Sequence, residues 1–568
     1  MSLMLHEETF MTSEPAVGVP EDRTIGQVLV DAARARGNFP AVFLPQADRV
    51  ISYREFLAEV DAAARGLVAL GIGRGDHVAV WATNVLEWIV LQFATARIGA
   101  VLVTINPAYR PFELAYVLEQ SDAVALFLVD QFKSSNYHEM VADVVAELSA
   151  ATPGELHSTK FPQLRSVVSL KGDTPPGMLS WQDVLDRGKR VPAAAIERRQ
   201  AELAPGDKIN IQYTSGTTGF PKAATLTHRN LLLNAYYTGK CQNLTSEDRI
   251  CIPVPFYHCF GCVLGTLCTV VHQAAMVIPA EYFDPEATLR AIESERATSI
   301  YGVPTMFIAQ LEHPTFADRD LSSLRTGIMA GSPCPIEVMK KVVDVMGAAE
   351  ITIAYGLTEA SPVITQTRVD DPLDLRVKTV GRPLPGVEVK LVDPSTGQTL
   401  GDGKQGELCT RGHVVMLGYY KNPEATSAAI DKDGWLHTGD LATREPNGYY
   451  RITGRIKELI IRGGENVYPR EVEEYLFTHP DIEQATVVGI PDPRLGEEIC
   501  TWIILREGAS LSEDDVRTFC KGQLAHFKVP RYVRFVEAFP QTVTGKIQKF
   551  KIRELMSKEL GLCEQETA

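Results

Sequence analysis

The alternation of strand-like and helix-like segments is the feature of this sequence that most constrains its fold. Residues 77–81 have the pattern of a strand, residues 85–98 that of a helix and residues 100–105 that of a strand. A helix over residues 112–120 and a strand over residues 123–129 continue the order. Strands that alternate with helices of this length form βαβ units, which build parallel sheets with helices on their faces. We therefore predict an α/β fold.

A second alternating region covers about residues 227–365, and shorter elements follow it. Its predicted strands are residues 251–254, 275–278, 299–303 and 325–329, and its predicted helices are residues 285–294 and 336–345. Residues 381–441 have short strands separated by Gly/Pro turns, which is typical of a small β-barrel or sheet. The last region has helices predicted at residues 471–478 and 513–524 and strands at residues 485–490 and 500–505.

The length of 568 residues predicts two or more domains. We expect a large N-terminal domain, residues 1–456, with two parallel-sheet subdomains and a small β-barrel. A smaller α+β domain, residues 457–568, should follow it.

Composition excludes several classes of protein. A hydrophobic content of 45% and a charged content of 22% are typical of a globular protein. The net charge of −15 argues against nucleic acid as a partner. The acidic first 23 residues lack the basic start and apolar core of a signal peptide. Polar, glycine and proline positions interrupt the apolar run at residues 260–280, so we expect a buried helix and a strand there, not a transmembrane segment.

The ten cysteines are spread along the chain without a dense framework. This usage indicates a reducing compartment, and we expect a cytoplasmic protein. Cys259 and Cys262 match the C-x-x-C spacing, but apolar residues surround them and no second pair lies at zinc spacing. Buried small hydrophobes are therefore favoured over a redox or metal role.

The stretch from Tyr213 to Lys222 has the composition of a phosphate-binding loop. Glycines let the backbone approach a ligand closely, and successive N–H and hydroxyl groups form a concave set of donors. A strand is predicted before it, at residues 208–212, and a capped helix begins near Thr227, so we expect a loop between a strand and a helix. Pro221 stands where a Walker A loop needs its second glycine. A flexible linker is the less favoured alternative.

This stretch resembles the phosphate loop of the adenylate-forming enzymes, which include acyl-CoA synthetases, firefly-type luciferases and adenylation domains of peptide synthetases. Ala223 departs from the family, which usually has glycine there. The resemblance implies binding of ATP through Thr214, Ser215, Gly216, Thr217, Thr218, Gly219 and Lys222.

Further stretches match this family in its own order. By resemblance, Gly331-Ser332-Pro333 borders adenine, and Tyr355 and Gly356 lie along the adenine and acyl groups. Thr358 would bond the α-phosphate, and Glu359 would help to hold Mg²⁺, which takes oxygen ligands. Asp440 would accept two ribose hydroxyls, and Arg455 would add a donor to the ribose or a phosphate.

The resemblance also assigns roles near the C-terminus. Lys457 matches the hinge between the two domains. Gly463 and Gly464 match the loop that lines the pantetheine tunnel, and Arg462 is a candidate contact for the CoA phosphates. Lys546 matches the lysine that bridges the carboxylate and the α-phosphate, two anions that must meet in the first step.

The implied acyl site contains His258, Val303, Gly331 and Tyr355. The segments 257–264 and 301–307 have mainly apolar and small side chains. They offer no arginine or lysine for a second carboxylate and no acid for an amino group. An apolar monocarboxylate is therefore expected, and an aromatic acid remains open because apolar walls also hold a planar ring.

The resemblance implies an ATP-dependent acyl-CoA ligase that releases AMP and pyrophosphate, with ATP, Mg²⁺ and CoA as its small-molecule partners. Residues 489–492, 527–531 and 546–550 look most like medium-chain fatty acyl-CoA synthetases. An aryl-CoA or other carboxylate-CoA ligase and a stand-alone ligase that loads a carrier protein are the alternatives. A nucleotide-binding sensor is the non-enzyme alternative, and a homodimer is left open.

Overall fold

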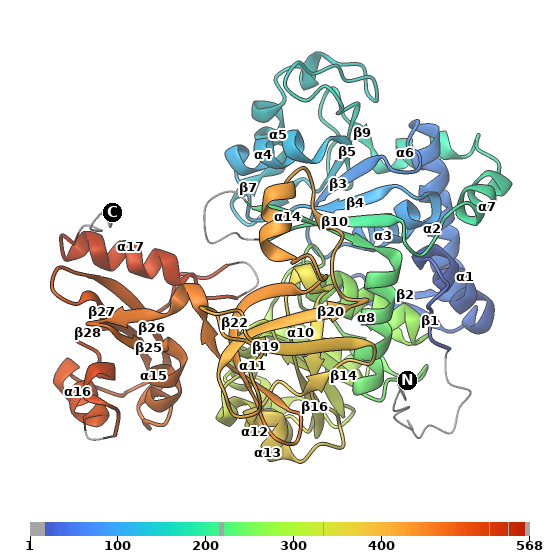
Figure 1. Cartoon of the computed structure of the whole chain (residues 1–568). Coiled ribbons are helices and arrows are strands. Elements are labelled where there is room, and N and C mark those ends of the chain that lie inside the picture. Colours follow the sequence, from blue (N-terminus) through green and yellow to red (C-terminus); the bar gives the residue numbers. More distant parts are fainter. Residues whose placement is uncertain (1–17, 215–220, 333, 522, 543–544, 563–568) are drawn as a thin grey trace.

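The computed structural model of the chain describes residues 18–214, 221–332, 334–521, 523–542 and 545–562. Two large, mixed sheets and the helices around them form the N-terminal part (Figure 1). The α/β fold predicted from the alternation is therefore confirmed.

The first sheet has nine strands, and its central strands are parallel. In spatial order they are β18 (Arg382–Pro383), β17 (Val363–Gln366), β16 (Glu350–Gly356), β15 (Thr326–Ala330), β14 (Ser299–Gly302), β12 (Arg249–Cys251), β13 (Ala275–Val277), β1 (Pro40–Leu44) and β2 (Arg49–Ser52). Its connecting helices are α10 (Pro285–Ser294), α11 (Pro304–Leu311), α12 (Ile336–Asp344) and α13 (Leu373–Lys378).

The second sheet has eight strands. In spatial order they are β21 (Gly418–Tyr419), β11 (Lys222–Thr227), β10 (Lys208–Thr214), β4 (Val101–Thr104), β3 (His77–Trp81), β5 (Ala123–Leu128), β8 (Ser166–Ser169) and β9 (Leu179–Ser180). Its helices are α1 (Ile25–Arg36), α2 (Tyr53–Ala69), α3 (Leu86–Ile98), α4 (Pro111–Ser121), α5 (Tyr137–Val144), α6 (Trp181–Gly188) and α7 (Ala193–Ala201), and β6 (Gln131–Phe132) pairs with β7 (Ser135–Asn136).

Local sequence explains where these elements begin and which are buried. Ser52 caps α2 in a capping box with Glu55, and Thr227 caps α8 (His228–Cys241) in the same way with Asn230. Helix α3 is apolar on every face, because it is buried between layers. Strand β5 is a continuous apolar run, as a parallel strand covered on both faces requires.

One apolar core joins the two sheets. Helix α8, the π-helix η3 (Phe260–Leu267) and α9 (Cys268–Val271) lie within it, and η3 is buried throughout. The buried helix and following strand expected at residues 260–280 are thus present. Among the described residues, no helix combines the length and apolar character that a membrane span needs.

Four antiparallel strands form the small β-rich part, which is a sheet and not the predicted barrel. They are β19 (Val387–Val392), β20 (Gly406–Gly412), β22 (Leu436–Arg444) and β23 (Tyr450–Arg455), with α14 (Pro423–Ala429) in a connection. The strand order β19-β20-β22-β23 does not pair its two end strands, which a closed barrel would require.

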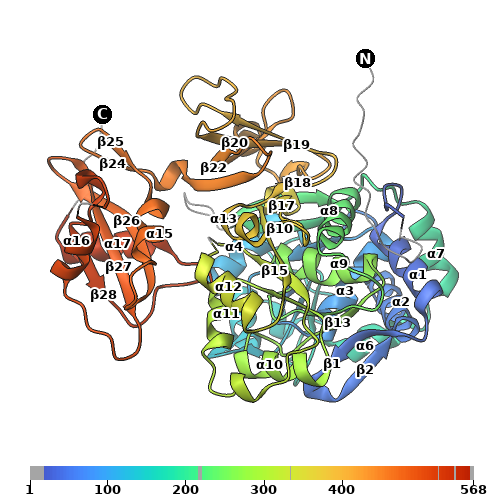
Figure 2. The same ribbon diagram turned by 90° about the horizontal axis from the view of Figure 1, so that it is seen from below.

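The C-terminal unit, from β24 onward, stands to one side of the N-terminal part (Figures 1 and 2). It has two apolar cores of its own. Its elements are β24 (Ile460–Arg462), β25 (Glu465–Val467), α15 (Pro469–Leu476), β26 (Ile482–Asp492), β27 (Gly496–Leu505), α16 (Glu513–Cys520), β28 (Tyr532–Phe535) and α17 (Lys549–Glu559). The 3-10 helix η6 (Ile456–Glu458) connects it to β23.

The structure corrects several local predictions. Strand β11 lies between the predicted phosphate loop and α8, so that loop connects two antiparallel strands, β10 and β11, instead of a strand and a helix. The strand predicted at residues 251–254 is Arg249–Cys251. Helix α5 ends at Val144, and a separate turn of 3-10 helix, Leu148–Ala150, follows it.

Candidate active site

Four neighbouring parallel strands of the first sheet end at one edge. The predicted acyl-site residues lie at the ends of these strands or in the segments just beyond them. Strands β16, β15, β14 and β12 are adjacent and parallel. Val303 follows β14 and Gly331 follows β15, while Tyr355 is the penultimate residue of β16. His258 lies in the segment that continues from β12. In open α/β sheets, ligands bind outside the carboxyl ends of the strands, so this edge is the candidate active site.

Gly331 and Val303 lie directly against each other at this edge. Gly331 has a φ of 91°, which favours glycine, and a Cβ added there would lie 3.0 Å from Cγ1 of Val303. Ser332 follows in a half-buried position, and Pro333 lies outside the described residues.

His258 is held as a neutral hydrogen-bond acceptor. Its Nδ1 accepts the backbone N–H of Phe260 at 3.1 Å. Burial, together with the positive charge of Lys546, lowers the pKa of His258 to about 4. The imidazole is uncharged near neutral pH and offers no cation for a second substrate carboxylate.

The π-helix η3 begins at Phe260, two residues after this histidine. Its widened turn leaves the carbonyl oxygen of Cys262 to accept from Gln92 at 2.8 Å and from Thr266 at 2.7 Å. Turns of π-helix are rare and often occur at functional sites. Cys259 and Cys262 are buried free thiols, so the burial predicted for them is present.

Asp440 and Arg455 face each other across β22 and β23. The Arg455 Nε–Asp440 Oδ1 distance is 2.6 Å, and Asp440 is only 3% exposed. The Asp440 charge raises the pKa of Arg455, so the guanidinium stays charged. Burial and the same carboxylate raise the pKa of Tyr355, whose hydroxyl donates to Asp440 Oδ2 at 2.7 Å. These residues connect the small sheet to the strand ends of the first sheet.

Thr358 and Glu359 lie in the 3-10 helix η5 (Thr358–Ala360), two residues beyond Gly356, which ends β16. The hydroxyl of Tyr419 donates to Glu359 Oε1 at 2.7 Å. The ring of Tyr419 also lies 5.1 Å from the ammonium nitrogen of Lys222, within the range of a cation–π contact. A continuous set of contacts therefore joins Lys222, at the end of the predicted phosphate loop, to the predicted magnesium ligand.

The loop that carries Lys546 reaches this edge from the C-terminal unit. A Cβ added at Gly545 would lie 2.7 Å from Thr305 Oγ1 and 3.1 Å from Val303 Cγ2. Lys546 keeps solvent-accessible surface, but protein surrounds it closely enough for desolvation to lower the pKa of its ammonium. The charge of Arg455 adds to this lowering.

Three carboxylates raise the pKa of the Lys546 ammonium and so partly offset this lowering. They belong to Glu458, Asp440 and Glu359. Glu458 is itself held by Lys549, whose Nζ lies 3.4 Å from its Oε2. Burial would raise the pKa of Glu458, but the charges of Lys549 and Arg455 outweigh burial and lower it. The predicted residues Lys546, Asp440, Arg455 and Glu359 thus form one electrostatic cluster.

The residues predicted to meet CoA lie elsewhere in this conformation. Gly463 and Gly464 form the exposed turn between β24 and β25, with φ values of 61° and 88°. Arg462 is paired with Glu498, with an Nη2–Oε2 distance of 3.0 Å, and Glu498 is 1% exposed. Lys457, the predicted hinge, is exposed in η6. The structure therefore brings Lys546, and not the glycine turn, to the sheet edge.

The predicted phosphate loop is described only at its ends. Thr214 pairs with Lys222 in the β10–β11 hairpin, and the Thr214 hydroxyl donates to the Lys222 carbonyl at 3.4 Å. Ser215, Gly216, Thr217, Thr218 and Gly219 lie outside the described residues.

Sequence reasoning missed two residues of this site, Tyr419 and Glu458. Tyr419 belongs to Gly418-Tyr419-Tyr420, an aromatic pair after a glycine within a polar, turn-rich region. That pattern does not place the side chain near Glu359, which only the fold brings within hydrogen-bond distance. Glu458 adjoins the predicted hinge, and only the fold brings its charge near Lys546.

Two protein families match the chain, the AMP-binding enzymes over residues 29–420 and the AMP-binding enzyme C-terminal domain over residues 471–546. The chain belongs to the family of AMP-binding enzymes, and the predicted membership of the adenylate-forming enzymes is confirmed.

Two related sequences and one protein of solved structure are similar to most of this chain. A Bacillus subtilis (strain 168) protein named as a provisional acyl-CoA synthetase, YngI, is 52% identical over 531 residues, covering 94% of this chain and 96% of the relative. The mitochondrial medium-chain acyl-CoA ligase ACSF2 of Danio rerio is 45% identical over 513 residues, covering 90% of this chain and 84% of the relative. ATP-bound MatB from Rhodopseudomonas palustris has a TM-score of 0.81 at 29% identity, covering 94% of this chain and 99% of that protein.

The same solved protein gives a comparison of conformations. Apo MatB, at the same identity and coverage, has a TM-score of 0.71. This chain is therefore more similar to the ATP-bound form than to the apo form.

Proposed function

We propose that this chain is an ATP-dependent acyl-CoA ligase for a fatty acid of medium length. The acid's carboxylate attacks the α-phosphate of ATP, forming acyl-adenylate and releasing pyrophosphate. The CoA thiol then attacks the acyl carbon, forming the thioester and releasing AMP. The chain's family supports the first half-reaction, and the names of its two relatives support the second.

The observation that carries the proposal is the convergence of Lys546 with Asp440, Arg455 and Glu359 at the strand ends. Two anions must approach each other in the first step, which makes a fixed cation between them stabilising as charge is shared. We assign that role to Lys546. Asp440 would accept the ribose hydroxyls, and Arg455 would orient Asp440 and add a donor.

We assign the remaining ATP contacts to the strand ends and the β10–β11 loop. The adenine side consists of Gly331, Ser332, Pro333, Tyr355 and Gly356. The phosphate side consists of Thr214, Ser215, Gly216, Thr217, Thr218, Gly219, Lys222 and Thr358.

Glu359 is our proposed ligand for Mg²⁺. Its carboxylate fits, because Mg²⁺ prefers oxygen and is usually bound by one or two carboxylates together with substrate phosphates. Tyr419 fixes the orientation of this carboxylate through its hydrogen bond to Oε1. When bound, Mg²⁺ would neutralise charge on the phosphate oxygens.

We propose that Lys457 divides two domains, residues 1–456 and 457–568, that rotate between the half-reactions. The described arrangement, with Lys546 at the sheet edge, suits adenylate formation, and the greater similarity to ATP-bound MatB supports this assignment. Rotation would exchange Lys546 for the Gly463–Gly464 turn. Arg462 would then leave Glu498 to meet CoA phosphates.

The neutral His258 and the apolar neighbours Val303 and Phe260 support an apolar acid. The relative named as a medium-chain acyl-CoA ligase supports the choice of length. Free thiols at every described cysteine support a reducing compartment, and we propose the cytoplasm.

The test is pyrophosphate release by the purified full chain with ATP, Mg²⁺ and octanoate, followed by addition of CoA. We expect release that depends on octanoate, and formation of octanoyl-CoA and AMP once CoA is present. A chain that releases no pyrophosphate with any carboxylic acid would be a binding protein. Release without any thioester would indicate that another acceptor replaces CoA.

A further inference from the structure

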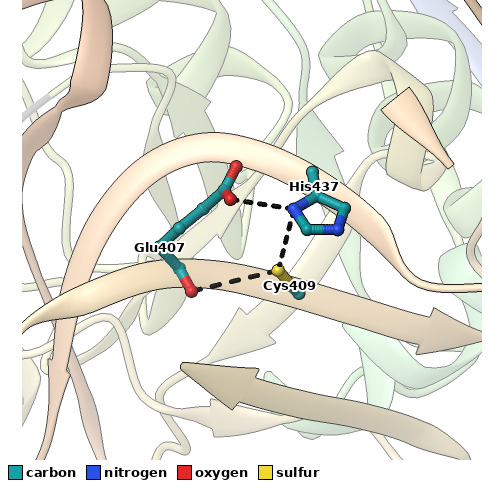
Figure 3. Close-up of side chains that lie close together, drawn as sticks. All are labelled: Glu407, Cys409 and His437. Carbon is teal, nitrogen blue, oxygen red and sulfur yellow. Dashed lines mark hydrogen bonds and ion pairs between the residues drawn. The ribbon is translucent and has the colours of Figure 1, made fainter. Parts of the chain in front are cut away.

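A cluster of three different ligand types lies in the small sheet, outside the nucleotide site. Figure 3 shows Glu407 and Cys409 on β20 with their side chains directed toward His437 on β22. One atom from each, a carboxylate oxygen, Sγ and a ring nitrogen, lies within 4.8 Å of the other two. Among the described residues, no other group of histidine, cysteine and acidic side chains meets this condition.

The three side chains converge on a single ring nitrogen. Nδ1 of His437 is 2.8 Å from Oε2 of Glu407 and 3.4 Å from Sγ of Cys409. In neutral imidazole, a ring nitrogen either carries one proton or offers one lone pair. If Nδ1 donates to the carboxylate, it cannot also accept the thiol proton. The thiol has one further contact, with its Sγ 4.0 Å from the backbone carbonyl oxygen of Glu407. When Nδ1 donates to the carboxylate, the Sγ–Nδ1 contact is therefore left without a hydrogen bond from the thiol, whereas a cation among the three side-chain atoms engages all of them.

We propose that Glu407, Cys409 and His437 form a binding site for Zn²⁺. Zinc takes sulfur, imidazole nitrogen and carboxylate oxygen, and three protein ligands leave a fourth position for water. With ordinary bond lengths, a tetrahedral site separates nitrogen and sulfur by about 3.5 Å and nitrogen and oxygen by about 3.3 Å. The first distance matches the structure, and the second requires Glu407 to move by about half an ångström.

The surroundings of the cluster fit a metal site. Nε2 of His437 lies 3.8 Å from Oδ2 of Asp431, and a histidine ligand usually presents its other nitrogen to such a carboxylate. His437 is 33% exposed along its side chain, so an ion can reach the cluster, while Cys409 is fully buried. Lys390, opposite Cys409 in β19, is the nearby cation, and its ammonium lies over Trp435 at 4.3 Å.

Zinc at this position would stiffen the segment that presents Asp440. Oε1 of Glu407 accepts the backbone N–H of Gly439 at 3.0 Å, directly before Asp440. Coordination through Oε2 leaves that bond in place. On binding, the Cys409 thiol loses its proton to solvent and forms the Zn–S bond, and no oxidant or reductant is involved. The site does not depend on the substrate proposed above.

The test is titration of the purified, chelator-treated full chain with Zn²⁺ alone, by calorimetry in a phosphine-reduced buffer. We expect one site per chain. Replacement of Zn²⁺ by Co²⁺ should give a thiolate-to-cobalt absorption band. Either of two results with the unmodified chain would contradict the proposal: no binding of Zn²⁺, or a cobalt complex that lacks this absorption band.

Two cysteine variants distinguish this cluster from the other described cysteine–histidine pair. Cys259 lies 3.6 Å from Nδ1 of His258 and is the matched control. Cys409→Ser should weaken Zn²⁺ binding by at least about 10-fold, and Cys259→Ser should leave it unchanged. Equal affinity in Cys409→Ser, or weakening only in Cys259→Ser, would contradict the proposal. If Cys409→Ser does not fold, Glu407→Gln, with the same expectation, takes its place.

Discussion

At the scale of single residues, the candidate active site depends on charged side chains that lie close to one another. The Lys546 ammonium is influenced by one cation, Arg455, and by the carboxylates of Glu458, Asp440 and Glu359. ATP would bring several negative charges into this set. The lysine side chain is therefore positioned for a step in which negative charge accumulates, and not for binding an apolar acyl chain.

Replacement of Lys546 by alanine should affect the two half-reactions very differently. We expect Lys546→Ala to slow adenylate formation about 100- to 1000-fold, since it removes a group that stabilises developing charge. Thioester formation from supplied acyl-adenylate and CoA should stay within a few-fold of the unmodified protein. Rapid-quench measurement of each half-reaction checks this expectation. Lys551→Ala, an exposed position in the same unit, is the control and should change neither rate. A similar loss in both half-reactions would remove Lys546 from its assigned role.

The lowered pKa of Lys546 predicts the alkaline behaviour of the first half-reaction. Lysine carries its charge below its pKa, so adenylate formation should fall as pH rises through the lowered value. The fall should therefore begin at a lower pH than an ordinary lysine, with a pKa of about 10.4, would give. Pyrophosphate release without CoA measures this limb. In Lys546→Arg the fall in the rate of adenylate formation should move to higher pH, because guanidinium stays protonated. An unmoved limb would assign the titration to another group.

At the scale of elements, sequence patterns predicted where helices and strands occur better than which strands pair with each other in the sheets. The helix at residues 285–294 and the strand at residues 77–81 match the structure, because their periodicity and flanking residues are local. No local pattern indicated that β1 and β2 join the first sheet, although most of that sheet comes from residues 249–383. Pairing across more than 200 residues depends on tertiary packing, which a local pattern does not contain.

The site shows the same division between local and tertiary information. Gly331 and the Asp440 motif could be identified, because a turn or a family motif has a fixed spacing. Tyr419 and Glu458 could not, because their contacts with Glu359 and Lys546 arise only when distant segments meet. Strand β11 was missed because Lys222–Thr227 lacks the strict alternation of a half-buried strand and is mostly buried.

Among the glycines of the described helices, Gly261, in the π-helix η3, has the least room for an added side chain. A Cβ there would lie 2.2 Å from the carbonyl oxygen of Pro255, which is backbone and has little freedom to move. We expect Gly261→Ala to lower the free energy of unfolding by about 1–3 kcal/mol and to raise the KM for the acid. Thermal unfolding and steady-state kinetics measure both effects. Gly206→Ala, where no atom lies within 4 Å of the added Cβ, is the control and should be neutral. An unchanged free energy of unfolding and an unchanged KM in Gly261→Ala would show that η3 does not shape the acyl site.

At the scale of the whole molecule, the loop that carries Gly545 and Lys546 brings the C-terminal unit to the sheet edge, and η6 joins that unit to β23. Lys457 lies within this 3-10 helix, where φ is close to the value that proline imposes. Lys457→Pro should therefore fit the described arrangement and oppose rotation away from it. Adenylate formation should stay within a few-fold of normal, and thioester formation should fall at least about 100-fold. Near-normal rates in both half-reactions would place the hinge elsewhere.

The central claim, that this ligase acts on a medium-chain fatty acid, is tested most directly by kcat/KM across a series of acids. The series consists of acetate, the even-chain acids up to palmitate, and benzoate, each with saturating ATP and CoA. Each buried methylene contributes about 0.8 kcal/mol, so kcat/KM should rise roughly four-fold per carbon until the site is full and then fall, with the maximum near octanoate. A preference for acetate or benzoate over octanoate would contradict the claim and leave the acyl-CoA ligase assignment in place.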